Sequence, residues 1–259
     1  RSESIAYYSS PAIQYILAGA MFMAGMNFAL HYQISRRHWK NLLRDTELRT
    51  YFLIVALAVI GICAGTIFLG NFTDFSTTFR ESLFTTLSVI STTGFVTADY
   101  ETWPVFNQFI VLCLFLMGGC AGSTAGGFKI IRHVILFKLL GQQIKKLFHP
   151  KAIIQLRIDH QVIQPEIVVS VMAFLMIYLA SLLAGTLIMT ATGLDMVSAG
   201  SVTASCLGNI GPALGTLGPT DNYASISTIG KWVLSFLMLL GRLEILTVIV
   251  LFSPSFWRR

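Results

Sequence analysis

The stretch GGCAGSTAGGFK, residues 118–129, places five glycines within ten positions at the end of a strongly apolar run. That run, residues 102–128, carries no charged side chain and is long enough to cross a bilayer as a helix. Each glycine in a helix interior costs roughly 1 kcal/mol against alanine, so five disfavour continuous helix by about 5 kcal/mol. We therefore expect a membrane helix over residues 106–138 that is broken at 118–127.

The whole chain has the composition of a membrane protein, with 54% hydrophobic and 12% charged residues. Uncharged runs long enough to cross lie at 4–35, 50–73, 102–128 and 167–194, and a fifth apolar run, 231–252, contains Arg242 and Glu244. Two more runs, 82–98 and 196–220, are too short or too rich in glycine and proline to cross. We expect each of these two to enter the membrane and turn back.

The basic residues indicate how the chain is oriented. Of its 18 lysines and arginines, 14 lie in the segments 36–49, 129–157 and 258–259, and the positive-inside rule assigns such segments to the cytoplasm. These segments flank apolar spans and carry few aromatic residues that could stack on bases, so we expect no nucleic-acid partner. The net charge of +6 is thus read as a topology signal of a multi-pass protein in the lipid bilayer.

An internal repeat relates the two re-entrant runs. A shift of 117 residues lays TTLSVISTTG, residues 85–94, over VTASCLGNIG, residues 202–211. The shift aligns Thr86 with Thr203, Ser88 with Ser205, and Gly94 with Gly211. Each copy follows a spanning run and precedes another, so the repeating unit is helix, short helix, glycine turn and helix.

The glycine turns have the character of a cation filter. Unpaired backbone in hydrocarbon costs several kcal/mol per group, so a re-entrant loop must line water or be buried in protein. Glycine tolerates a positive φ, which lets successive carbonyls face one way and replace the water shell of a cation. The candidate filter residues are Thr92, Thr93, Gly94, Phe95, Asn209, Ile210, Gly211 and Pro212, with the ion at Thr92, Thr93, Gly94, Asn209, Ile210 and Gly211. Thr92 and Thr93 could add hydroxyl oxygens.

The expected fold is an all-α membrane protein of repeated helix–pore-loop–helix units around a cation pathway. Residues 1–49 would hold the last helix of a preceding repeat, at about 12–34, and a cytoplasmic loop. Residues 50–160 would hold a repeat with filter loop 91–95 and broken helix 106–138, then a cytoplasmic linker that either follows the inner membrane surface or is an ordinary connection. Residues 161–259 would form the final repeat, with filter loop 208–212.

The broken helix is the candidate gate. A charge in mid-span costs about 2.5–3.5 kcal/mol, so Arg242 needs a partner, and Glu244 two residues on lies on another side of the helix. Loop carbonyls of 118–127 are natural acceptors for Arg242. The candidate gate residues are Gly118, Gly119, Gly122, Ser123, Thr124, Gly126, Gly127 and Arg242. An Arg242–Glu244 contact after helix distortion, pairing of Glu244 elsewhere, and a pure helix-packing role for the glycines remain open.

Several motifs together resemble the Trk/Ktr potassium-uptake channel family. They are STTGF followed by ADY (91–100), GGCAGSTAGGFK (118–129), SCLGNIGPALG (205–215) and LLGRLE (239–244), while GMNFALHY (25–32) favours the Trk-type pore subunit. The resemblance implies a potassium pathway of four repeats in one polypeptide, an intramembrane gating loop at 118–127 and a matching arginine at Arg242. It also implies a homodimer in the cell (inner) membrane, a cytoplasmic nucleotide-binding regulatory subunit and no cofactor.

Two filter loops are present where the family has four, so we expect a piece of a longer protein, with pairing of two copies as the alternative. The leading interpretation is potassium uptake by a protein that is not an enzyme. A membrane-embedded enzyme acting on a phosphorylated or lipid substrate would have to use Lys129, Arg132 and His133. A non-conducting assembly subunit is the third possibility.

The charge asymmetry yields a labelling test of topology. The four native cysteines are first removed, and a single cysteine then replaces Asp74 or Asp221. Each of these cysteines should react with an impermeant thiol reagent from outside intact cells. A cysteine replacing Lys146 should react only after permeabilisation, because its segment is basic. Labelling of the Lys146 position in intact cells would contradict this orientation.

Overall fold

The computed structural model describes residues 4–8, 10–36, 44–70, 74–152, 154–159, 161–251 and 254–257. Residues 37–43 and 258–259, which belong to the basic segments, lie outside this part of the chain. The prediction of an all-α membrane protein is confirmed, since the described residues are mostly helical. The exception is a short antiparallel hairpin of β1 (Arg157–Ile158) and β2 (Gln161–Val162), in which Arg157 faces Val162.

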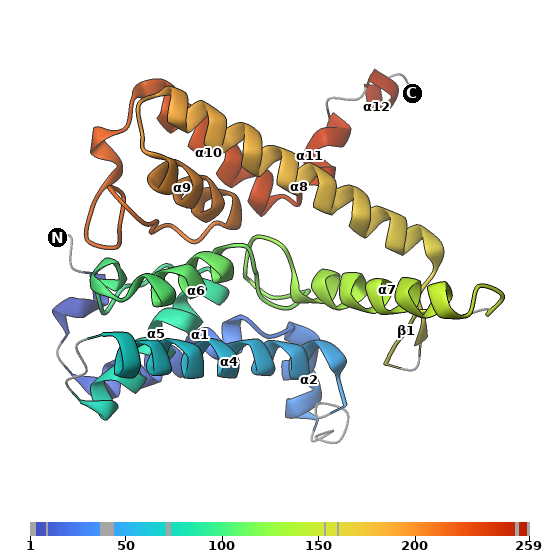
Figure 1. Cartoon of the computed structure of the whole chain (residues 1–259), viewed down its shortest axis with the longest axis horizontal. Coiled ribbons are helices and arrows are strands. Elements are labelled where there is room, and N and C mark those ends of the chain that lie inside the picture. The colour runs from blue at the N-terminus through green and yellow to red at the C-terminus, as the bar shows by residue number, and fades with distance from the viewer. Residues whose placement is uncertain are drawn as a thin grey trace.

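Two helical units pack side by side (Figure 1). The first consists of α4 (Thr46–Leu69), α5 (Phe75–Ile90), α6 (Val105–Phe115) and α7 (Ile130–Phe148). The second consists of α8 (Pro165–Ala191), α9 (Met196–Gly208), α10 (Thr228–Arg242) and α11 (Ile245–Leu251). Single-turn helices lie at Ser4–Tyr7, Tyr100–Thr102, Tyr223–Ser225 and Pro254–Trp257. The short helices α5 and α9 pack against the longer helices of their own units, and each unit contributes to an apolar core of its own.

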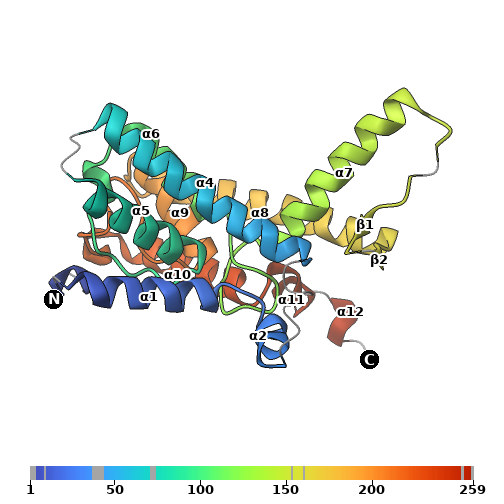
Figure 2. The same ribbon diagram turned by 90° about the horizontal axis from the view of Figure 1, so that it is seen from below.

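Among the described residues, α4 and α8 are each long and apolar enough to cross a membrane. The pair α1 (Pro11–Ala24) and α2 (Phe28–Ser35) would add a third span if counted as one, but it is bent by 103° (Figure 2). The expectation of one helix over 12–34 is therefore wrong. Gly25 ends α1, and Asn27 caps α2 by accepting a hydrogen bond from Ala29 N at 2.9 Å.

The last helices of both units are interrupted as well. Between α6 and α7 the backbone leaves the helix over residues 116–129, called here the glycine loop, and Figure 1 shows this loop midway along the molecule. The helix α7 continues to Phe148, beyond the predicted end at 138, because Leu, Lys and Gln sustain it until Pro150. In the second unit α10 ends at Arg242, and Glu244 adopts a φ of 55° before α11 begins.

Aspartates begin both short helices, α5 and α9. Asp74 accepts a hydrogen bond from Thr77 N at 3.1 Å at the start of α5, and Asp195 accepts from Ser198 N at 3.1 Å at the start of α9. Hydrogen bonds from Ser198 hold the pKa of the Asp195 carboxyl below its usual range. An ionised carboxylate is favourable there, because it faces the partly positive end of the helix.

A buried amide joins α4 to α6 and gives a stability test. Asn107 is fully buried, and its Nδ2 donates to Ile62 O at 3.1 Å and to Thr66 Oγ1 at 2.8 Å. A Cβ on Gly65 would overlap Asn107 Oδ1, so Gly65→Ala must displace this amide from its partners. We expect a loss of about 1–3 kcal/mol, the cost of leaving buried polar groups unpaired, and a lower Tm in detergent.

Gly19→Ala is the matched control for this substitution. None of the described residues lies within 4 Å of a Cβ on Gly19, so the alanine should leave stability unchanged or raise it by up to about 1 kcal/mol through helix propensity. Equal Tm values for Gly65→Ala and the unmodified protein would contradict the role given to Asn107.

Candidate functional site

The two candidate filter loops have the same backbone conformation 117 residues apart. Thr92 and Asn209 have φ values of 53° and 59°, while Gly94 and Gly211 have values of 73° and 113°. Positive φ is available to glycine at little cost, but a β-branched residue such as Thr92 pays of order 1–3 kcal/mol for it. Asparagine tolerates the left-handed region, so the strain lies at Thr92, and the positive φ at the same place in each copy indicates that the turn itself is required.

Matching serines tie each loop back to its own short helix. Ser88 Oγ donates to Phe95 O at 2.7 Å, and Ser205 Oγ donates to Pro212 O at 2.6 Å. These serines were aligned by the sequence repeat, and they fix the last carbonyl of each loop. Each loop is therefore hydrogen-bonded to a side chain of the helix that precedes it.

The hydrogen bonds divide the loop carbonyls into two groups. Those of Phe95, Gly211 and Pro212 accept side-chain donors, the donor to Gly211 being the Tyr223 hydroxyl. Within the part of the chain that the structure describes, no protein donor reaches the carbonyls of Thr92, Thr93, Gly94, Asn209 and Ile210. This second group is free to face a cation, and it contains five of the six proposed ion-contacting residues.

The threonine hydroxyls have other partners. Thr92 Oγ1 accepts a hydrogen bond from Gly126 N at 2.9 Å, and Thr93 Oγ1 lies 2.8 Å from Ser91 Oγ. The suggestion that these hydroxyls add filter ligands is therefore not supported, and Thr92 instead connects the first filter loop to the glycine loop.

The two filter loops touch each other asymmetrically. A Cβ on Gly94 would overlap the backbone oxygen of Ile210, whereas nothing among the described residues lies within 4 Å of a Cβ on Gly211. Gly94 is thus required by both its φ and the approach of a neighbouring backbone, and Gly211 by its φ alone.

The glycine loop closes on itself and is buried at one end. Gly118 N donates to Phe128 O at 2.9 Å, and Lys129 Nζ donates to Ala125 O. Residues 125–130 are buried, while Gly122 and Thr124 at the tip are exposed. The tip is therefore the exposed part of the loop.

Arg242 makes the contact expected of it. Its Nη1 donates to Thr124 O at 2.7 Å, which joins the end of α10 to the tip of the glycine loop. Glu244 pairs instead with Arg132, Nη2 to Oε2 at 2.6 Å. Of the possibilities left open by the sequence, the structure therefore has Glu244 paired elsewhere.

The break between α1 and α2 also holds the loop. Cys120 N donates to Gly25 O at 2.9 Å, Thr124 N donates to Ala24 O at 3.4 Å, and Phe28 N donates to Gly122 O at 3.1 Å. The three interrupted helices thus meet at one level, and each break satisfies backbone groups of another.

The other side of the glycine loop lies against the second filter loop. A Cβ on Gly126 would stand 2.7 Å from Gly208 O, and the Asn209 side chain lies near both Gly126 and Gly241. Asn209 Nδ2 is buried without a hydrogen-bond partner. The loop therefore contacts both candidate filter loops directly.

Sequence reasoning missed Glu47, which lies in the first turn of α4 and is 7% exposed. Its Oε1 accepts hydrogen bonds from Ala121 N at 2.6 Å and Ile131 N at 3.1 Å. The sequence shows only an acidic residue at the start of an apolar helix, and this pattern does not indicate a hydrogen bond to the glycine loop.

A row of serines on α9 was missed as well. Ser201 Oγ donates to Leu214 O at 2.9 Å, and Ser198 Oγ accepts from Thr216 N at 2.9 Å. Together with Ser205 they recur at helical spacing on one face of α9. They satisfy loop backbone that would otherwise be unpaired, and this periodic row of hydroxyls was a usable signal.

The side chains required by the enzyme alternative are engaged within the protein. Lys129 bonds Ala125 O, Arg132 pairs with Glu244, and His133 Nδ1 lies 3.2 Å from Lys129 O. The described residues contain no group of three or more His, Cys, Asp or Glu that could hold a metal ion.

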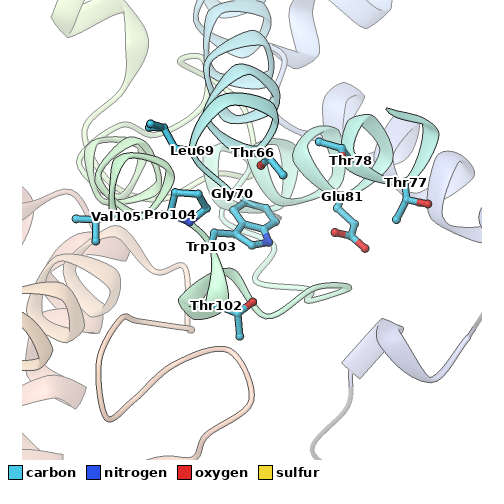
Figure 3. Close-up of a pocket in the computed structure, with 10 residues that line it drawn as sticks. All are labelled: Thr66, Leu69, Gly70, Thr77, Thr78, Glu81, Thr102, Trp103, Pro104 and Val105. Atoms are coloured by element: carbon cyan, nitrogen blue, oxygen red, sulfur yellow. The ribbon is translucent and has the colours of Figure 1, made fainter. Parts of the chain in front are cut away.

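A pocket of about 540 Å³ lies where α4 ends and α5 and α6 begin (Figure 3). Glu81 and Trp103 line it together with Thr66, Leu69, Gly70, Thr77, Thr78, Thr102, Pro104 and Val105. None of the candidate filter or gate residues borders this pocket, so it is separate from the proposed ion path.

Comparison with known proteins agrees with this arrangement. A family model described as TrkH, a cation transport protein, matches residues 1–259. The Trk system potassium uptake protein TrkH of Salmonella typhimurium (strain LT2) is 37% identical over 257 residues, which cover 98% of this chain and 53% of that protein. TrkG of Escherichia coli (strain K12), another Trk system potassium uptake protein, is 33% identical over 258 residues, covering 99% and 53%.

A solved structure has the same fold. The crystal structure of the potassium transporter TrkH from Vibrio parahaemolyticus matches with a TM-score of 0.91 and 33% identity, over 99% of this chain and 55% of that one. The chain spans about half the length of the curated relatives it matches.

Proposed function

The chain belongs to the TrkH family of cation transport proteins, and from this premise we propose that it forms part of a gated pore for potassium uptake. The observation that carries the proposal is the pair of loops with matched positive-φ turns and free carbonyls. Such carbonyls replace the water shell of a dehydrated cation. The chain would contribute the end of one repeat and two complete repeats.

The glycine loop is proposed as the gate of this pore. Three observations favour this role. The tip at Gly122 and Thr124 is exposed, Arg242 donates a hydrogen bond to that tip, and the loop contacts both candidate filter loops. A loop that lies next to a filter and is joined to the end of α10 by the Arg242 hydrogen bond at its tip can obstruct ions and can also be released.

We propose the membrane location, orientation and partners of the pore from the family resemblance and the basic segments. The protein would be a multi-pass homodimer of the cell (inner) membrane with its basic loops in the cytoplasm, where a nucleotide-binding regulatory subunit acts on it. Potassium would be the transported substrate, and no cofactor is proposed.

The filter proposal is tested by substituting its glycines. Gly94→Ser in the intact protein should reduce the preference for potassium over sodium by about tenfold or more, since the left-handed conformation alone costs about 1–2 kcal/mol for an L-residue. Gly211→Ser should have a smaller effect, because it adds the strain at φ 113° without the overlap with Ile210 O.

Gly193→Ser is the matched control for the filter test. Gly193 has a φ of 100°, and no residue that the structure describes lies within 4 Å of its Cβ position, so the serine adds the same kind of backbone strain outside the loops. Reversal potentials should change for Gly94→Ser and stay the same for Gly193→Ser. Unaltered ion preference at both Gly94 and Gly211 would mean that the filter lies elsewhere.

The gate proposal is tested by removing its contact. Arg242→Ala should raise the open probability in single-channel recordings by about tenfold, because it removes a hydrogen bond from a charged donor. Deletion of residues 122–124 should raise it further by removing the obstacle. The double variant should add little to the deletion, since both changes act through one contact.

Arg242→Lys, which keeps a cationic donor, should fall between Arg242→Ala and the unmodified protein. A deletion variant that inserts correctly but retains its original open probability would refute the gate. If the glycines serve only helix packing, the deletion should instead impair folding or reduce flux.

A further inference from the structure

The base of the glycine loop, which Gly118 N closes by donating to Phe128 O, is also bound by one carboxylate from another helix. Glu47 Oε1 accepts hydrogen bonds from Ala121 N at 2.6 Å, within the loop, and from Ile131 N at 3.1 Å, just after it. One oxygen atom therefore holds both sides of the base, 74 and 84 residues away along the chain. The Arg242 contact, in comparison, holds only the tip.

The bond to Ile131 serves as a helix cap. The first backbone N–H groups of α7 have no partner within the helix, and the N-cap residue Lys129 supplies no side-chain acceptor. The Lys129 ammonium bonds Ala125 O instead. Glu47 takes the place of the missing cap from outside, where a carboxylate is also favoured by the helix dipole.

These two bonds explain why an acid is buried here. A carboxylate that is 7% exposed is costly unless donors satisfy it, and the two backbone amides are such donors. The same bonds make the loop sensitive to small movements of Glu47, because one displacement affects both amides.

The residue before Glu47 is tied to the β1–β2 hairpin. Asp159, in the turn of that hairpin, accepts hydrogen bonds on Oδ1 from Thr46 N at 3.0 Å and from Thr46 Oγ1 at 2.6 Å. The hairpin and the glycine loop are thus joined through two consecutive residues at the start of α4.

We infer that Glu47 is a positioning residue of the gate and that the connection Asp159–Thr46–Glu47 transmits movement of the hairpin to the loop. The inference rests on the proposed function in that the loop is taken to be the gate. Displacement of the hairpin would shift the first turn of α4, weaken both bonds to Glu47 and release the base of the loop.

Hydrogen exchange of the intact protein in lipid nanodiscs tests the anchor without any measurement of transport. Glu47→Ala should accelerate exchange at Ala121 and Ile131 by about tenfold, the factor expected for a lost hydrogen bond to a charged acceptor. Glu47→Gln keeps a neutral oxygen that can accept both bonds, so exchange should lie between the rates of the unmodified protein and Glu47→Ala.

Glu166→Ala is the matched control, because Glu166 is the first-turn acid of α8, the corresponding helix of the second unit. It is exposed and should leave the loop unchanged. Unchanged exchange in Glu47→Ala would overturn the inference. Equal acceleration in Glu47→Gln and Glu47→Ala would also overturn it, because the retained acceptor would then have no effect.

The connection to the hairpin is tested at Asp159, whose φ of 46° suits both glycine and asparagine. Asp159→Gly removes the acceptor and should accelerate exchange at the same two amides, whereas Asp159→Asn keeps an acceptor and should not. Combined with Glu47→Ala, Asp159→Gly should add nothing. Full additivity of the two changes would overturn the connection.

Open probability separates this inference from the proposed function. Both Glu47→Ala and Asp159→Gly should raise it together with the exchange rates. Faster exchange with unaltered open probability would refute the positioning role along with the gate, and would leave the filter proposal untouched. Raised open probability in the tip deletion with no exchange response to Glu47→Ala would refute the anchor alone.

Discussion

Backbone groups that leave a helix inside a membrane must find partners within the protein, and this requirement shapes the centre of the molecule. Three helices are interrupted, at residues 25–27, 116–129 and 243–244. The first two breaks bind each other through backbone hydrogen bonds, as from Cys120 N to Gly25 O, and the third contributes Arg242 to Thr124 O. The first two breaks supply backbone partners to each other in addition to bonds within their own segments, such as Gly118 N to Phe128 O, and the third supplies a side-chain donor to the second.

The need for hydrogen-bond partners also divides the carbonyls of the two candidate filter loops into those that accept a protein donor and those that do not. Serine hydroxyls on the short helices bind the last carbonyl of each filter loop, at Phe95 and Pro212, and leave several earlier carbonyls without protein donors. A free carbonyl at this depth is costly unless water or an ion meets it. The carbonyls without a donor among the described residues are the basis of our proposal that these loops hold a dehydrated cation, and Thr92 in the first loop has a strained backbone conformation.

Much of this arrangement could be predicted from local patterns. Uncharged runs identified the long helices α4 and α8, five clustered glycines predicted the break after α6, and the need of Arg242 for an acceptor pointed to the loop carbonyls. The predictions were wrong at two helix boundaries that the sequence marks only weakly. The pair α1 and α2 is bent by 103° at residues 25–27, where the sequence shows only one glycine and Asn27, and α7 continues beyond residue 138 through leucine, lysine and glutamine. Both errors concern where a helix stops: hydrogen bonds to the glycine loop stabilise the break between α1 and α2, whereas helix propensity up to Pro150 sets the end of α7.

By itself, the sequence determined the membrane class, the repeated unit and the residues of the two glycine turns, because apolar length, charge asymmetry and glycine spacing act locally. The tertiary structure alone decided which partners satisfy the interrupted backbone. Glu47 reaches Ala121 and Ile131, Thr46 reaches Asp159, and Glu244 pairs with Arg132 across 112 residues. A carboxylate that accepts from a distant backbone amide leaves no periodicity or motif in the sequence, since every non-proline residue offers the same donor.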